Sequence, residues 1–270
     1  MRRRDFLVGG FAAATWPLVA RAQQATAARP TADEDLFLHF YNDPQPARLV
    51  GFLDRYAKRA QIWNAFPPVV GFFAIVFRQH PDWIDRLIPD HPDARTAMAI
   101  AAALHLSGTS RIDPSLAWRL ADAGTDKALA AELAYLPSSL EEMHIVRPTH
   151  LDVLWGAAFA SGDERFPMMI VDFLAATANR SELIATEIAK AALAISAQGP
   201  SGVSGGDLKN KYGERLAIEI IIAATAGWAL RSNAQQHLFV DNVLKKYIAA
   251  NPGTPATKVI SVLRPRPRDL

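Results

Sequence analysis

The chain has 270 residues, 50% of them hydrophobic, and its 29 Lys and Arg against 27 Asp and Glu give a formal net charge of +2. This length and composition exclude a disordered chain or a coiled coil, and they allow one large domain or two small ones. The sequence contains no cysteine, which excludes a disulfide, a thiolate metal site, a cysteine nucleophile and a lipidated cysteine.

Residues 1–22 have the pattern of a cleavable export signal. A basic start precedes a moderately apolar run over residues 6–20, and a small-residue site follows at Ala20-Arg21-Ala22. The segment Arg3-Arg4-Asp5-Phe6-Leu7 resembles the RRxFL core of twin-arginine (Tat) signals. The resemblance implies that the Tat translocase exports the chain to the periplasm and that the signal is cleaved after about Ala22. The alternatives are the general secretory route and an N-terminal helix that stays attached, although the run is shorter than the ~20 residues of a membrane span.

Cleavage of the signal changes the charge of the chain. Residues 1–22 include four Arg and one Asp, so the mature chain has a formal net charge of −1. A near-neutral chain has no electrostatic footprint for nucleic acid, which is therefore not expected as a partner. The small polar residues 23–33 are predicted to form a linker after the cleavage site.

Residues 34–250 are predicted to form one all-α domain, because apolar residues recur at helical spacing and almost no period-two alternation is present. A first apolar stripe starts after Pro46. Pro67-Pro68 can open the next helix and His80-Pro81-Asp82 can close it. That helix is apolar on all sides, which predicts that it is buried. Further helices are predicted over 94–106, from Asp113-Pro114, and from Thr125 to Leu136.

A helical hairpin is predicted over residues 149–177. Each of its helices has apolar residues at the spacing i, i+3, i+4, i+7 and i+8, which gives one wide apolar face. These residues are Leu151, Leu154, Trp155, Ala158 and Phe159 in the first helix, and Phe166, Met169, Ile170, Phe173 and Leu174 in the second. The turn at Ser161-Gly162-Asp163 is too short for anything but antiparallel helices, so Trp155 and Phe159 are expected to meet Ile170 and Phe173.

Three helix starts are predicted from capping patterns. Thr149 with Asp152, and Ser138 with Glu141, have the spacing of a capping box. Asn179 and Glu182 are predicted to cap a helix with a buried face formed by Ile184, Ile188, Ala191, Ala192 and Ile195.

The remaining segments are a flexible Gly-rich stretch over 199–213, a core helix over 215–230, a last helix over 234–250 and an extended, Pro-interrupted tail over 251–270.

Part of the hairpin has a familiar pattern. Trp155-Gly156, Phe159, Gly162 and Phe166 resemble the first helix and turn of a tetratricopeptide repeat, but the chain has no clean 34-residue period. The resemblance implies an irregular stack of antiparallel helical hairpins, either like a tetratricopeptide array or α-solenoid or as a compact helical domain.

The segment 202–206 matches the G-x-S-x-G pattern of a serine hydrolase elbow, with Ser204 as nucleophile and His237 as a possible base. That elbow requires a strand before the serine, whereas a helix is predicted there. We therefore interpret the segment as a loop between helices, with Asp207 as the cap of the next helix.

Glu141 and His144 have the i, i+3 spacing used by di-iron helical bundles, and His150 and Asp152 follow closely. Such a site needs two Glu-x-x-His pairs and two further carboxylates, and the chain has only one pair. These four residues are the candidate metal ligands, and no cofactor is predicted.

The leading prediction for function is a non-enzymatic periplasmic protein that binds a protein, a peptide or an apolar ligand on a face of stacked helices. No stable membrane span is expected after cleavage. The alternative is a Tat-exported enzyme or a protein that carries a metal or cofactor.

Overall fold

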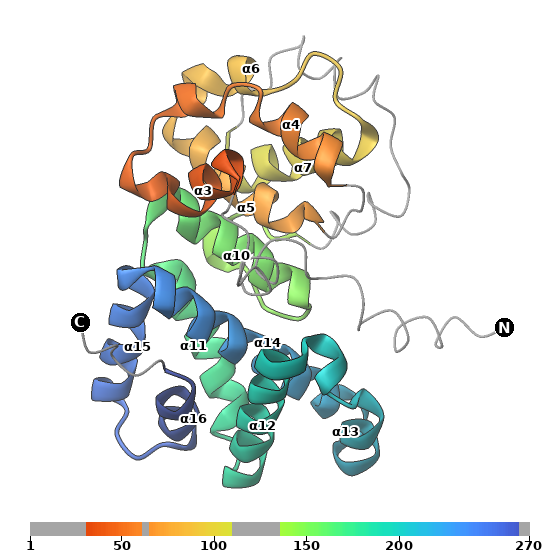
Figure 1. Ribbon diagram of the computed structural model, residues 1–270, viewed down its shortest axis with the longest axis vertical. Coiled ribbons are helices and arrows are strands. Elements are labelled where there is room, and N and C mark those ends of the chain that lie inside the picture. Colours follow the sequence, from red (N-terminus) through yellow and green to blue (C-terminus); the bar gives the residue numbers. More distant parts are fainter. Residues whose placement is uncertain (1–30, 61–64, 110–135, 265–270) are drawn as a thin grey trace, which may run out of the picture. The chain divides into compact units, whose positions relative to one another are not determined.

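A computed structural model describes residues 31–60, 65–109 and 136–264 of the chain. Within these residues it has twelve α-helices and no strand, and the helices pack in antiparallel contacts (Figure 1). The predicted all-α class is confirmed. None of the helices in these ranges is both long enough and apolar enough to cross a membrane. The export signal and the helices predicted to begin at Asp113 and Thr125 lie outside the described residues.

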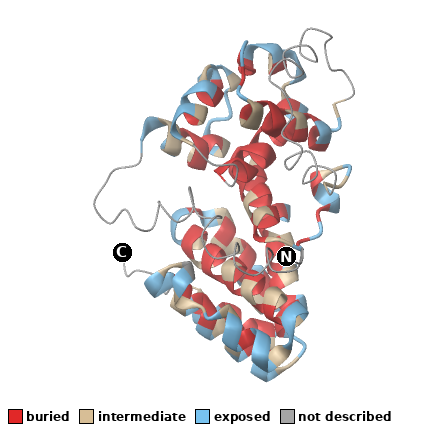
Figure 2. Cartoon of the chain, turned by 90° about the vertical axis from the view of Figure 1, so that its right-hand side faces the viewer, coloured by how far each residue is buried: buried red, intermediate tan, exposed pale blue. Residues whose placement is uncertain are grey.

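The chain divides into two compact units. The N-terminal unit comprises the described residues within Gln24–His144 and Asp152–Asp163, and the C-terminal unit comprises those within Ile145–Leu151 and Glu164–Leu270. Buried residues, red in Figure 2, occupy the inner faces of the helices, and exposed residues occupy their outer faces.

The N-terminal unit is built around one apolar helix. Its elements are α3 (Ala32–His39), α4 (Phe52–Arg59), α5 (Pro67–Gln79), α6 (Ile84–Leu87), α7 (Ala94–Ser107) and, from residue 152 onward, α10 (Pro148–Ser161). Helix α5 begins at the proline pair and ends before His80, as predicted. Every residue from Pro67 to Phe77 is buried, which confirms that α5 is covered on all sides.

Two glycines allow α5 and α10 to touch through their backbones. A Cβ added at Gly71 would lie 1.8 Å from the Val153 carbonyl oxygen, and one at Gly156 would lie 1.8 Å from the Pro68 carbonyl oxygen. Both contacts are far inside van der Waals distance, so only glycine permits this crossing.

Aromatic rings fill the space beside this crossing. The ring of Phe37 on α3 is 4.5 Å from Phe72 on α5 and 6.2 Å from Phe159 on α10. Helix α3 is held at its start by a capping box in which the Glu34 amide and the Thr31 hydroxyl are 3.3 Å apart. Thr31 lies in the segment predicted as a linker, so this cap was not predicted.

The C-terminal unit is organised around its longest helix. Its helices are α11 (Arg165–Ala178), α12 (Glu182–Gln198), α13 (Gly205–Tyr212), α14 (Glu214–Gln236), α15 (Leu238–Ala250) and α16 (Pro255–Leu263). Helix α14 packs against each of the other five. This confirms that the segment after Gly213 is a core helix, and α14 is longer than predicted because it continues to Gln236.

The predicted capping positions are wrong at three helix starts. Helix α10 begins at Pro148, so Thr149 lies inside it. A 3-10 helix begins at Leu140, and its flanking Ser139 makes no side-chain cap. Ser181 caps α12 by accepting a hydrogen bond from the Ile184 amide, so Asn179 has another role.

Two further boundaries differ from the prediction. The chain is extended at His237 (φ −127°, ψ 111°), so α15 begins at Leu238, later than expected. The tail predicted as extended contains α16, whose start is capped by Thr254 and has Pro255 at its first position.

The turn after α10 behaves as expected. Gly162 has a φ of +65°, and α11 begins at Arg165 with Pro167 in its first turn. Residues 152–163 and 164–178 belong to different units. The contact of Trp155 and Phe159 with Ile170 and Phe173 therefore stays a prediction.

Candidate functional site

The structure describes all four candidate metal ligands. Glu141 is exposed and paired with Arg78, whose Nη1 lies 2.8 Å from its Oε1. His144 is exposed in the N-terminal unit, and His150 is buried in the C-terminal unit. Over the ranges that the structure describes, no group of three or more His, Asp or Glu side chains is placed to hold a metal ion.

Asp152 is the predicted ligand with the most unusual environment. Although part of the residue is exposed, its Oδ2 atom is enclosed and has no hydrogen-bond partner among the described residues. Burial raises the pKa of this carboxyl well above its usual range. Nε1 of Trp155, one turn further along α10, is enclosed in the same way. The Tyr56 hydroxyl donates to the Ala65 carbonyl oxygen, and burial, with the nearby Asp152, raises its pKa.

Ser204 is a helix cap. Its Oγ accepts a hydrogen bond from the Asp207 amide at 3.3 Å, and it directly precedes α13. The expectation that Asp207 caps this helix is wrong, since Asp207 lies in the first turn. A 3-10 helix over Pro200–Gly202 precedes Ser204 where a hydrolase elbow requires a strand. His237 is buried between α14 and α15.

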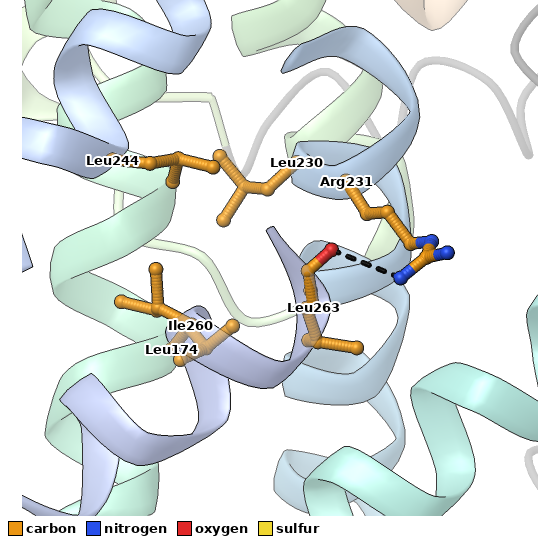
Figure 3. Close-up of a pocket in the computed structure, with 7 residues that line it drawn as sticks. Leu174, Leu230, Arg231, Leu244, Ile260 and Leu263 are labelled. Atoms are coloured by element: carbon orange, nitrogen blue, oxygen red, sulfur yellow. Dashed lines mark hydrogen bonds between the residues drawn. The ribbon is translucent and has the colours of Figure 1, made fainter. Parts of the chain in front are cut away.

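The C-terminal unit contains a groove that the sequence analysis did not find. We call it the α16 groove: α11, α12, α14 and α15 pack against α16 and bury its apolar face, while its other face is exposed. Ala256, Val259, Ile260 and Leu263 of that face are each at most 3% exposed. Leu174, Gly227, Leu230 and Leu244 form the floor, as Figure 3 shows for the three leucines.

One glycine shapes the floor of the groove. A Cβ at Gly227 would lie 2.6 Å from Cδ1 of Leu263 and 3.2 Å from Cδ1 of Leu174. The missing side chain lets Leu263 approach the backbone of α14. A cavity of about 10 Å³ remains beside these residues, which is about the space of one water molecule. It is far below the roughly 300 Å³ of a small-molecule site, so α16 itself is what fills the groove.

Side chains of the groove bind both backbone ends of α16. At its start, Oδ1 of Asn179 accepts a hydrogen bond from the Ala256 amide at 2.9 Å. At its end, Nη1 of Arg231 donates to the Leu263 carbonyl oxygen at 3.2 Å (Figure 3). These are groups that a helix cannot satisfy internally.

Two carboxylates on the groove bind cations, one on α16 and one on the residue that follows it. Oε1 of Glu182 is 2.5 Å from the Lys258 ammonium, and both side chains are exposed. Oδ1 of Asp241 is 2.7 Å from Nε of Arg264, in a more buried pair. Burial opposes the ionisation of Asp241, but hydrogen bonds from Arg264 and Lys245 outweigh it and lower its pKa.

The sequence did carry a signal for this helix. Thr254-Pro255 is a cap followed by proline at the first helical position, and the apolar residues that follow have helical spacing. Nothing local, however, indicated what Asn179 and Arg231 would bind.

Comparison of the chain with protein-family models, curated proteins and solved structures found no match. Function must therefore be inferred from the chain's own residues.

Proposed function

We propose that the protein is an exported, non-enzymatic helical protein that binds a protein or peptide partner in the periplasm. One observation carries the proposal: the C-terminal unit holds a two-turn helix in a groove by its apolar face and by both its ends. A helix as short as the nine residues of α16 is unstable alone in water, so the groove supplies its helicity. Binding of an amphipathic helix in an apolar groove is a common mode of peptide recognition.

The Tat-like signal supports the periplasmic location. Replacing Arg3 and Arg4 together by Lys should leave the precursor in the cytoplasm, as measured by fractionation and immunoblotting. Normal export of this variant would assign the chain to the general secretory route instead.

Site-specific photo-crosslinking in the exporting cell tests for a partner. The photoreactive residue replaces Leu183, which lies on α12 beside Glu182 of the groove and is 53% exposed, or Val50, which lies in the N-terminal unit and is 49% exposed. We expect a discrete protein adduct at Leu183 and none at Val50. Absence of an adduct at Leu183, or equal adducts at both positions, would contradict the proposal.

The second candidate is a Tat-exported enzyme or a carrier of a metal or cofactor. Asp152 favours it, since an enclosed carboxyl with a raised pKa is typical of catalytic acids. Elemental analysis and an absorbance spectrum of the purified protein separate the two candidates. A stoichiometric metal or chromophore would favour the second.

A further inference from the structure

We infer that the α16 groove is the partner's binding site, that it accepts a short basic amphipathic helix from another protein, and that α16 occupies it until that helix displaces it. This inference rests on the proposed function and adds to it the chemistry of the partner and a means of regulation.

The end contacts recognise a helix without reading its sequence. Asn179 binds a backbone amide and Arg231 binds a backbone carbonyl oxygen. Every helix has such unpaired groups at its ends. The two bound groups are on Ala256 and Leu263, seven residues apart, so at 1.5 Å per residue they are separated by roughly 10 Å along the helix. The groove therefore selects helices of about two turns.

The floor and the carboxylates specify which short helices fit. The residues of α16 that face the floor are apolar and have the spacing i, i+3, i+4 and i+7. The first is the small residue Ala256, and the last is Leu263, which contacts Gly227. Glu182 pairs with Lys258, two residues after the first apolar position at Ala256, and Asp241 pairs with Arg264, directly after the last apolar position at Leu263. An acidic residue at either position would face a carboxylate, so a basic partner helix is favoured.

The connection between α15 and α16 is short. Only Asn251–Thr254 separate the two helices, and Gly253 there has a φ of +77°. Because this link keeps α16 close to the groove, its effective concentration is high and an outside helix binds only to the open fraction. Weakening the hold on α16 should therefore tighten partner binding.

The first test uses the full chain and a fluorescent peptide with the sequence of residues 252–264. Leu263→Ala removes the side chain over Gly227 and leaves the floor intact. We expect this variant to bind the peptide at least about tenfold more tightly than the parent in fluorescence anisotropy, because its open fraction is larger. A peptide with Ile260→Glu is the control and should not bind. Unchanged or weaker affinity of the variant would overturn the inference.

A second test does not depend on that variant. Since the chain has no cysteine, one introduced thiol reports its own exposure. Ala256→Cys places it under α16, and Ala229→Cys places it on the face of α14 opposite Gly227, where burial is similar. We expect faster labelling of Ala256→Cys by a thiol reagent, and further saturable acceleration by the peptide. Equal rates at both positions, or no effect of the peptide, would show that α16 opens only when the protein unfolds.

Two outcomes separate this inference from related ideas. An adduct at Leu183 without faster labelling of Ala256→Cys would leave the proposed function standing and reject the displacement of α16. A concentration-dependent dimer of the Leu263→Ala chain, measured by light scattering, would show that a second copy's α16 fills the groove and would overturn the assignment to another protein.

Discussion

The substitution Gly156→Ala tests the backbone contact between α5 and α10. Its new Cβ would lie 1.8 Å from the Pro68 carbonyl oxygen, 2.7 Å from the carbonyl carbon and 2.9 Å from the Phe72 amide nitrogen. All three are backbone atoms, so no side-chain rotation relieves the contact. To reach even 3.0 Å from the oxygen, the helices must separate by at least 1.2 Å.

The magnitude follows from two opposing effects. Overpacking a core costs typically about 1–3 kcal/mol, and a contact between backbones belongs at or above the upper end. Alanine gains up to about 1 kcal/mol over glycine in helix propensity. We therefore expect Gly156→Ala to lower the free energy of unfolding by about 2 kcal/mol or more.

Urea unfolding followed by circular dichroism measures this change. The matched control is Gly206→Ala in the first turn of α13, where a Cβ meets nothing closer than Ser204 Oγ at 3.9 Å. The control should be neutral or stabilising by up to about 1 kcal/mol. Because Gly71 lies at the same crossing, Gly71→Ala and Gly156→Ala together should cost less than the sum of the two. A parental midpoint for Gly156→Ala would refute the backbone contact.

Three other substitutions have defined outcomes. Trp155→Ala removes a ring that is 1% exposed and should cost roughly 3–5 kcal/mol in urea unfolding; an unchanged midpoint with a weakened partner adduct would make Trp155 a surface binding residue. Ser204→Ala should cost about 1 kcal/mol because it removes the cap of α13, and labelling of Ser204 by a fluorophosphonate would contradict its purely structural role. Asp152→Asn removes a carboxyl that ionises near pH 4 in the unfolded parent but keeps its proton in the folded parent up to a raised pKa. The parent's stability relative to this variant should therefore be greatest below about pH 4 and fall as the pH rises to the folded pKa; parallel stability curves at pH 4, 6 and 8 would exclude a buried proton.

Local sequence determined most helices and several of their ends. The apolar spacing of α12 identified its buried face, since a helix brings Ile184, Ile188 and Ile195 to one side whatever surrounds it. Proline fixed other boundaries because it removes a backbone donor: Pro67 opens α5, and Pro167 lies in the first turn of α11.

Capping residues were not decided locally. Asn179 and Ser181 are both good caps and lie two residues apart, and Ser181 caps α12 while Asn179 binds the Ala256 amide, 77 residues further along the chain. Asp152 has capping-box spacing, but α10 starts too early for it to serve, and its Oδ2 is enclosed. Several polar side chains can satisfy one helix end, so the choice depends on which of them another element needs.

Tertiary structure alone decided two features, the close crossing of α5 and α10 and the helical state of α16. Gly71 and Gly156 appear locally as weak points in helices, and their value arises only where the two backbones cross. The tail reads as extended because prolines interrupt it and nine helical residues are marginal in water. Burial of Ile260 and Leu263 against four other helices supplies the missing free energy, and such contacts join residues too distant in the chain for any local pattern to reveal.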